Sequence, residues 1–369
     1  MSVKPVKVGV IGCGAISDAY FKANTTFEIL DFVACADLVL DRAKEKAEKH
    51  NIPRACSPAE LLADDDIEIV INLTVPKAHA EVNLAIIDAG KSAHVEKPLA
   101  VTREDGKSEL AAAKKKGVLL GGAPDTFYGG GHQTSRKLIA DGWIGKPVAA
   151  TAFMMSGGVE GWHPNPWFYY DVGGGPMFDM GPYYLTALVN LFGPARRISG
   201  STSKGQAQRV ISNGIEDGKV IDVVVPTHVA GTIDFANGVV ATVVMSFDIP
   251  GGANLPNIEV YGTEGTIGVP DPNGFGGTVS VRRLDGERLD VPLTHGYTGG
   301  HRGIGVADMA YALRCGRKHR ANGEVAYHVL DMMHAFHDSS DSEKHVHLES
   351  TCEQPRALPM GLRPGTLDE

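Results

Sequence analysis

The stretch VKVGVIGCGAIS, Val6–Ser17, decides the fold of this chain. Its short apolar run predicts a buried strand, and the glycine turn that follows leads into a predicted helix. In such a strand–turn–helix, Gly12 allows the tight turn and Gly14 lets the backbone approach a pyrophosphate. The helix N-terminus, beginning at Ala15 and Ile16, adds donors and a favourable dipole for phosphate. The turn predicts a dinucleotide site, although alone it is also consistent with a purely structural turn.

An acidic residue, Asp37, follows the next apolar strand at the offset typical of dinucleotide-binding folds. A carboxylate there accepts hydrogen bonds from the adenosine ribose and repels a 2′-phosphate, which favours NAD(H) over NADP(H). Arg42, further along, can be recruited by a 2′-phosphate, so NADP(H) stays the less favoured alternative. Asp37 can also be interpreted as a simple helix cap.

Strands and helices alternate through residues 1–125, which we interpret as one domain. We predict strands at Phe32–Ala36, Ile67–Leu73, Ala93–Glu96 and Val118–Gly121, and helices at Asp18–Asn24, Asp41–His50, Lys77–Ala89 and Arg103–Lys116. Because crossovers between parallel strands are right-handed, this alternation predicts an N-terminal Rossmann domain. Its sheet is expected to be parallel and doubly wound, with helices on both faces.

After Pro124 the strands lengthen and alternate in polarity, which is typical of antiparallel sheets. We predict strands at Val148–Met155, Arg197–Thr202, Thr227–Phe235 and Val239–Phe247, and helices at Gly131–Asp141, Pro182–Leu191, Ile304–Cys315 and Tyr327–Phe336. Residues 126–369 are therefore expected to form a C-terminal α/β domain with an open, predominantly antiparallel sheet. The tail from Glu353 is expected to be irregular.

Length and composition exclude several classes of protein. A chain of 369 residues exceeds one comfortable core, so two domains are expected. A net charge of −9, with no basic tract, argues against nucleic-acid and anionic-membrane partners. Five cysteines without a CxxC pair indicate a reducing compartment, and no apolar run is long enough for a membrane helix. We therefore expect a cytoplasmic protein.

Three further motifs lie along the chain: NLTVP at Asn72–Pro76, HVEKP at His94–Pro98 and GGGPMFDMGPY at Gly173–Tyr183. Together with the glycine turn, these motifs resemble the Gfo/Idh/MocA family, which includes glucose–fructose oxidoreductase and inositol dehydrogenases. The resemblance covers nearly the whole chain. It implies an open C-terminal sheet that pairs with the sheet of another copy, which gives a homodimer or homotetramer.

The resemblance also implies positions for the groups around the reacting centre. The side chains expected beside the nicotinamide are Thr74, Pro76, His79, Glu96 and Lys97. The family usually carries a histidine four residues after the aspartate that is Asp179 here, and this chain has Tyr183 instead. Some members that act on dihydrodiols and keto-sugars resemble this chain in using tyrosine there.

Oxidising a secondary alcohol requires the loss of a proton together with a hydride. A tyrosine with a pKa near ~10 is a poor base at neutral pH, and a neighbouring ammonium lowers that pKa. We expect Tyr183 to exchange the proton, Lys97 to hold the substrate oxygen and Asp179 to hold a hydroxyl. Asp179 and Tyr183 share a helical face only if one helix spans both; if the helix starts at Pro182, that argument lapses. The ordinary alternatives are a core tyrosine and a surface lysine.

An aromatic segment, WHPNPWFYY at residues 162–170, precedes the glycine triplet. Trp162, His163 and Trp167 offer faces on which a polyhydroxylated ring can stack; alternatively, the segment packs one domain against the other. Other candidates for substrate contact are Asp125 and Phe127, where the domains meet, and His301–Arg302. The histidines and carboxylates lack metal-ligand spacing, so no metal site is predicted.

Three functions are compatible with these features. The leading one is an NAD(H)-dependent dehydrogenase or ketoreductase that acts on a sugar, an inositol or a similar cyclic polyol. A second keeps NAD bound and cleaves glycosides through transient oxidation and elimination. A third is a nucleotide-responsive binding protein without catalysis, against which the presence of both Lys97 and Tyr183 argues.

Overall fold

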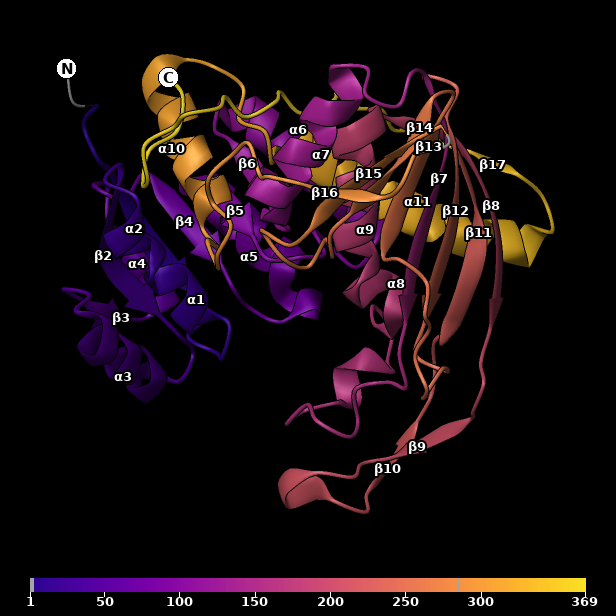
Figure 1. Cartoon of the computed structure of the whole chain (residues 1–369). Helices are drawn as coiled ribbons and strands as arrows, with labels where there is room; N and C mark the ends of the chain where they lie inside the picture. Colours follow the sequence, from indigo (N-terminus) through magenta and orange to yellow (C-terminus); the bar gives the residue numbers. More distant parts are fainter. Residues whose placement is uncertain (1–2, 285) are drawn as a thin grey trace.

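The N-terminal sheet is parallel throughout. The structure, a computed structural model, describes residues 3–284 and 286–369. The strands of this sheet are β1 (Val6–Ile11), β2 (Leu30–Ala36), β3 (Ala55–Cys56), β4 (Ile69–Asn72), β5 (Ser92–Val95) and β6 (Leu120–Gly122). Their order is β3-β2-β1-β4-β5-β6 (Figure 1). The predicted doubly wound Rossmann sheet is confirmed, and the strand order reverses between β1 and β4, where such sheets bind nucleotides.

The helices predicted around this sheet are present, except that the first is divided in two and one short helix was not predicted. They are α1 (Ser17–Phe21), α2 (Ala23–Thr26), α3 (Leu40–His50), α4 (Pro58–Leu62), α5 (His79–Asp88) and α6 (Arg103–Lys116), with the 3₁₀ turn η1 (Pro76–Ala78) before α5. The single helix predicted at Asp18–Asn24 is wrong: two short helices meet at Lys22. Helix α4 was not predicted, although Ser57 and Glu60 form the capping box that its SPAE sequence encodes.

The second sheet is mixed but mostly antiparallel, as predicted. Its strands are β7 (Pro147–Met155), β8 (Ala195–Ser203), β11 (His228–Phe235), β12 (Val240–Ser246), β13 (Ile258–Gly262), β14 (Gly265–Val269), β15 (Val279–Arg283), β16 (Leu289–Val291) and β17 (Val346–His347). They lie in the order β16-β15-β14-β13-β7-β12-β11-β8-β17, in which β7 and β12 pair in parallel and the other neighbours are antiparallel. A separate ribbon, β9 (Gln208–Val210) with β10 (Val220–Asp222), extends beyond the sheet (Figure 1).

Helices lie between the two sheets (Figure 1). The helices after residue 125 are α7 (Gly130–Ala140), α8 (Gly175–Asp179), α9 (Gly181–Phe192), α10 (Ile304–Cys315) and α11 (Gly323–Ser342). The 3₁₀ turns there are η2 (Thr126–Tyr128), η3 (Trp167–Tyr169) and η4 (Gly214–Glu216). Every residue of α9 is buried, and α11 contacts both α6 and β8. Helix α11 is longer than the predicted Tyr327–Phe336 at both ends; it starts earlier because Asn322 caps it by accepting from Val325 N.

Helix α10 returns to the N-terminal sheet. Its buried residues Ile304, Val306 and Met309 share an apolar cluster with Val8 and Val10 of β1. The chain that follows α10 runs beside β6, because Gly122 N donates to Ala321 O at 3.1 Å. The last residues, without helix or strand after β17, match the irregular tail that the sequence predicts. Within residues 3–284 and 286–369, no helix combines the length and apolar character needed to cross a membrane.

Candidate active site

The glycine turn after β1 leaves open space where a phosphate would approach. Gly12 has a φ of 101°, and a Cβ there would lie 2.7 Å from the carbonyl oxygen of Leu73, so only glycine fits. A Cβ on Gly14 would meet no protein atom within 4 Å. The turn residues Ala15 and Ile16 lead into the N-terminus of α1. The backbone around Gly14 therefore fits a dinucleotide pyrophosphate.

Asp37 lies beside this turn at the end of β2. One of its carboxylate oxygens accepts from Cys13 N at 2.9 Å, and the other accepts from Val39 N at 2.9 Å. Arg42 is exposed in the first turn of α3. Leu38, which no sequence motif marks, is 94% exposed next to Asp37. The sequence shows only an apolar residue after Asp37, and the exposure of Leu38 beside the glycine turn becomes apparent from the structure.

Two loops of the expected nicotinamide region are joined by His79. This histidine is the first residue of α5 and is buried; its Nδ1 lies 2.7 Å from the Pro98 carbonyl oxygen and its Nε2 lies 3.0 Å from that of Thr74. Burial lowers its pKa. Thr74 is further fixed by Asn72, whose Oδ1 accepts from the Thr74 hydroxyl at 2.7 Å. The loop that contains Thr74 and Pro76 is thus held against the loop that contains Lys97.

Lys97, just after β5, contacts both other residues that we expect to be catalytic. Its Nζ donates to Asp179 Oδ1 and to the Asp179 carbonyl oxygen, each at 2.7 Å, and lies 5.2 Å from the centroid of the Tyr183 ring. Burial alone would lower the pKa of Lys97, but the Asp179 carboxylate, with Tyr183 and Glu96, raises it. Lys97 therefore keeps its charge at neutral pH.

No single helix carries both Asp179 and Tyr183. Helix α8 begins with Pro176 in its first turn and ends at Asp179, and α9 starts anew at Gly181 with Pro182 in its first turn. The argument that four-residue spacing places the two side chains on one helical face therefore lapses. Lys97 brings them together instead.

Tyr183 is 6% exposed and lies between two cations. Arg302 Nη2 donates to its Oη at 3.0 Å, and the guanidinium carbon lies 5.5 Å from the ring centroid. Burial raises the pKa of Tyr183, and the positive charges of Lys97 and Arg302 only partly offset this effect. Lys97 acts as expected, because its charge lowers the pKa of Tyr183. The net shift is nevertheless upward, so the expectation that this pKa lies below its ordinary value is wrong.

Glu96 faces the interior, next to Lys97. Its Oε1 accepts from the Tyr20 hydroxyl at 2.8 Å, and its Oε2 accepts from Lys97 N at 2.9 Å. The side chain therefore links α1, which follows the glycine turn, to the segment that holds Lys97. Tyr20 was not predicted; no motif of the sequence marks it.

The aromatic segment lies on the surface near the glycine triplet. Trp162 is 66% exposed and Trp167 is 38% exposed, while the His163 ring packs edge-on against Tyr169 with 4.9 Å between centroids. Lys77 of η1 pairs with Asp171, the residue that follows the segment, at 2.5 Å, so the chain next to the segment contacts the N-terminal domain. Contact between domains and an exposed aromatic face are both present.

Asp125 and Phe127 lie in the interior rather than on an open surface. Asp125 is fully buried, and its Oδ2 accepts from Gly303 N at 2.8 Å and from Gly305 N at 3.2 Å, at the start of α10. Phe127 is 2% exposed. Both side chains are thus enclosed by the protein, whereas the aromatic segment is exposed.

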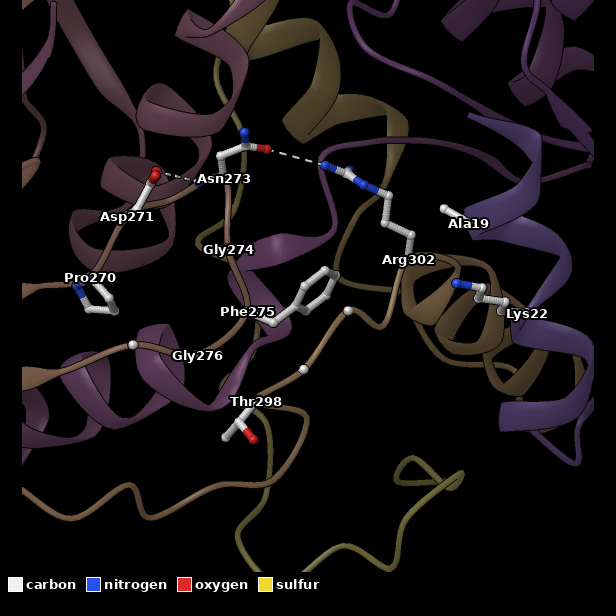
Figure 2. A pocket seen from close by; sticks show the side chains of 13 residues that line it. Ala19, Lys22, Pro270, Asp271, Asn273, Gly274, Phe275, Gly276, Thr298 and Arg302 are labelled. Carbon is white, nitrogen blue, oxygen red and sulfur yellow. Dashed lines mark hydrogen bonds between the residues drawn. The ribbon is translucent and has the colours of Figure 1, made fainter. Parts of the chain in front are cut away.

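A pocket of about 590 Å³ opens beside Arg302 (Figure 2). Residues Ala19 and Lys22 line one side, and the glycine-rich segments 274–277 and 298–300 line the other. Arg302 reaches along its wall to Asn273, to whose Oδ1 it donates at 3.2 Å. Across the described parts of the chain, no group of three or more histidine, cysteine, aspartate and glutamate side chains is arranged to hold a metal ion.

Known proteins resemble this chain in sequence and structure. Residues 6–122 match an oxidoreductase family with an NAD-binding Rossmann fold, and residues 132–268 match the GFO/IDH/MocA C-terminal domain. The 1,5-anhydro-D-fructose reductase of Ensifer adhaerens is 30% identical over 295 residues, which cover 77% of this chain and 82% of that relative. The trans-1,2-dihydrobenzene-1,2-diol dehydrogenase of Danio rerio is 30% identical over 270 residues, 71% of this chain and 73% of the relative.

Solved structures share the fold. Levoglucosan dehydrogenase in complex with NADH and levoglucosan superposes with a TM-score of 0.82 and 22% identity, over 94% of this chain and 100% of that chain. The aldose-aldose oxidoreductase from Caulobacter crescentus gives a TM-score of 0.79 with 19% identity, over 94% of this chain and 100% of that chain. With both family models matched and a relative aligned over most of its length, this chain belongs to the GFO/IDH/MocA family of NAD-binding oxidoreductases.

Proposed function

We propose that the chain is an NAD(H)-dependent dehydrogenase or reductase that acts on a secondary alcohol or ketone of a sugar, an inositol or a related cyclic polyol. The observation that carries the proposal is the contact of Lys97 with Asp179 and Tyr183, at the carboxyl end of β5 in a Rossmann sheet. The names of the similar proteins support a polyhydroxylated substrate.

The residues present fit a bound dinucleotide. Gly14 leaves room for the pyrophosphate, and the Asp37 carboxylate stands where it would favour NAD(H) by repelling a 2′-phosphate. The exposed apolar side chains Leu38 and Val75, on loops after β2 and β4, offer surfaces for flat rings to cover. When bound, the cofactor accepts or supplies the hydride. NADP(H) remains the alternative, because Arg42 is exposed nearby.

The side chains of the site handle the proton and the oxygen of the substrate. Lys97 stays protonated and positions the oxygen, stabilising negative charge that develops on it. Asp179 orients Lys97 and accepts from a substrate hydroxyl. Tyr183 holds its proton at neutral pH because burial raises its pKa. Proton donation to a carbonyl oxygen, as reduction requires, is therefore the direction that these residues favour at neutral pH.

The substrate would extend from this centre toward the exposed aromatic segment. Trp162, His163 and Trp167 present ring faces there, which suit the C–H faces of a sugar while hydroxyls take hydrogen bonds. We further expect a cytoplasmic homodimer or homotetramer paired through the C-terminal sheet. Asp125 and Phe127, being buried, would act by holding the domains rather than by touching the substrate.

The second candidate is cleavage of a glycoside through transient oxidation and elimination. A levoglucosan dehydrogenase of Pseudarthrobacter phenanthrenivorans is 26% identical to this chain over 283 residues. This similarity supports the second candidate, because levoglucosan is itself an anhydro sugar. Cleavage would consume substrate with no net change in NADH, whereas a dehydrogenase changes substrate and NADH in equal amounts.

The test is to follow NADH absorbance and fluorescence on the purified protein with a panel of sugars, inositols and keto-sugars, and to repeat active pairs with NADPH. Lys97→Met should bind NADH as the wild type does but lose at least ~100-fold in rate, since a charge-stabilising group is gone. Lys114→Met, at an exposed lysine of α6, is the matched control and should keep its rate. Undiminished activity of Lys97→Met would remove Lys97 from the mechanism.

A further inference from the structure

Tyr183 receives its hydrogen bond from an arginine that no family motif in the sequence marks. Within the described residues, the one hydrogen bond to Tyr183 Oη comes from Arg302 Nη2, at 3.0 Å. Lys97 lies over the ring instead, and its Nζ is already bound twice by Asp179. The cation that donates a hydrogen bond to the phenol oxygen is therefore Arg302.

The N-terminal domain holds Arg302 in place. The next residue, Gly303, has a φ of 95°, and a Cβ there would lie 2.6 Å from the Cβ of Ala23 in α2. The buried Asp125 carboxylate binds Gly303 N and Gly305 N and so fixes the start of α10. Arg302 thus reaches Tyr183 of the C-terminal domain from a loop that is anchored on the cofactor-binding domain.

The surroundings of Arg302 are arranged for a cation. Its Nη1 is buried without a hydrogen-bond partner among the described residues. Burial alone would lower the pKa of Arg302, but Tyr183, Glu96, Tyr20 and Asp125 together raise it. The guanidinium therefore remains charged: it donates to Tyr183 Oη, and the carboxylates of Glu96 and Asp125 favour its charge.

We propose that Arg302 is a positioning residue for the reaction: it holds the Tyr183 phenol by its oxygen, directs the phenolic proton toward the substrate and stabilises the phenolate. This inference rests on the proposed function. As the substrate carbonyl takes up the hydride, its oxygen takes the proton of Tyr183: the phenolic O–H bond breaks and a substrate O–H bond forms. The phenolate left behind faces Arg302 until solvent returns a proton.

Other charges also act on this phenol. The charged groups that face Tyr183 are Glu96, Lys97, Asp179 and Arg302. The two carboxylates disfavour the phenolate and the two cations favour it. The positive charge of Lys97 is balanced by the carboxylate of Asp179 in an ion pair. Loss of Arg302 should therefore leave the negative charge of Glu96 without a balancing cation near the phenol.

The experiment compares Arg302→Ala, Arg302→Lys and the control Arg314→Ala, which removes an arginine from the other end of α10, where it pairs with Glu68. Each NADH-bound protein is titrated for tyrosinate by ultraviolet absorbance, and the step due to Tyr183 is identified by its loss in Tyr183→Phe. Arg302→Ala should move that step up by about one pKa unit or more, Arg302→Lys by less, and Arg314→Ala not at all.

Activity gives an independent readout. Arg302→Ala should lower kcat by ~10- to 100-fold at neutral pH. Free guanidinium should restore part of this loss, because the truncated side chain opens the pocket of Figure 2 toward Tyr183. Guanidinium should not raise the rate of Arg314→Ala.

An unchanged tyrosinate step in Arg302→Ala, or a rate that guanidinium leaves as it is, would overturn the assignment. The titration needs no substrate. If the wild type proves inactive on the whole panel, the proposed function fails, while the titration still decides whether Arg302 stabilises the phenolate of Tyr183.

Discussion

The two halves of the proposed site are built in opposite ways. The dinucleotide turn lies within one stretch, Val6–Ser17, whose conformation is dictated locally by glycine. The reacting cluster is assembled from three separate places in the chain: Lys97, the short segment that carries Asp179 and Tyr183, and Arg302. Substitutions in a site formed by one stretch disturb it through backbone strain or blocked space. Substitutions in a site formed by distant residues disturb it through the loss of single side-chain contacts. Variants should therefore separate binding from chemistry.

The largest effect is expected at the assembled half. Tyr183→Phe keeps the ring between Lys97 and Arg302 but removes the proton, so we expect a loss of ~100-fold or more in rate with NADH binding unchanged. Burial raises the pKa of Tyr183, so the wild type should reduce its substrate at neutral pH and lose this activity only where Tyr183 ionises. Oxidation, which needs the phenolate, should accelerate as the pH rises.

The rates in both directions, measured across pH, check this prediction. Tyr184→Phe, at the neighbouring buried tyrosine whose hydroxyl accepts from Asn257 instead of Arg302, should leave the pH profile in place. If the alkaline limb persists in Tyr183→Phe, another group handles the proton.

The contiguous half should respond to glycine substitutions in two distinct ways. Gly12→Ala places a Cβ 2.7 Å from Leu73 O at a φ of 101°, so it should lower the free energy of unfolding by about 1–3 kcal/mol. Gly14→Ala meets no protein atom within 4 Å, so it should fold normally and raise the Kd for NADH by ~10-fold, about 1.4 kcal/mol.

Thermal unfolding and NADH fluorescence titration separate the two variants. Gly117→Ala, at a helix end with a φ of 71° and nothing within 4 Å, controls for backbone strain away from the turn. Tight NADH binding by Gly14→Ala would contradict the assignment of the open space to the pyrophosphate.

The contrast between the halves also explains what the sequence reveals. The Rossmann order and the positions of Gly12, Gly14 and Asp37 follow from patterns within short stretches, and the structure has them where predicted. The four-residue spacing of Asp179 and Tyr183 is compatible with one helix or with a new start at Pro182, and the structure ends α8 at Asp179 and begins α9 at Gly181. Arg302 escaped firm assignment because its partner lies 119 residues away and its position depends on the packing of Gly303 against Ala23.

A smaller effect is expected from the buried chain that supports the loop of Thr74. Asn83 donates to Glu109 at 2.7 Å and accepts from Asn72 at 2.9 Å, and burial raises the pKa of Glu109 to about 8 from its ordinary 4.5. Between these two values the folded chain holds a proton that the unfolded chain releases, so stability falls as the pH rises through this window.

Glu109→Gln should remove that loss of stability. Its Tm should exceed that of the wild type at the top of the window by several degrees and match it at the bottom. Glu104→Gln, at an exposed position of the same helix, should leave the Tm unchanged at both ends of this pH window. Parallel Tm curves for the wild type and Glu109→Gln across this range would mean that Glu109 is not titrating there.

The smallest effect is expected at the exposed aromatic segment. Trp162 is 66% exposed, so Trp162→Ala should alter the free energy of unfolding by no more than about 0.5 kcal/mol. If the ring stacks on the substrate, KM should rise by a few-fold, about 0.5–1 kcal/mol, with kcat kept. Trp143→Ala, at a 44% exposed tryptophan beyond α7, is the matched control. An unchanged KM would leave Trp162 as a surface residue only.

The central claim is that the two halves meet across one bound coenzyme. The most direct measurement is a crystal structure with NADH and an active polyol or ketone. We predict that the nicotinamide C4 atom lies about 3–3.5 Å from a substrate carbon whose oxygen contacts both Lys97 Nζ and Tyr183 Oη. A nicotinamide turned away from these two side chains, or a substrate oxygen that neither of them touches, would contradict it.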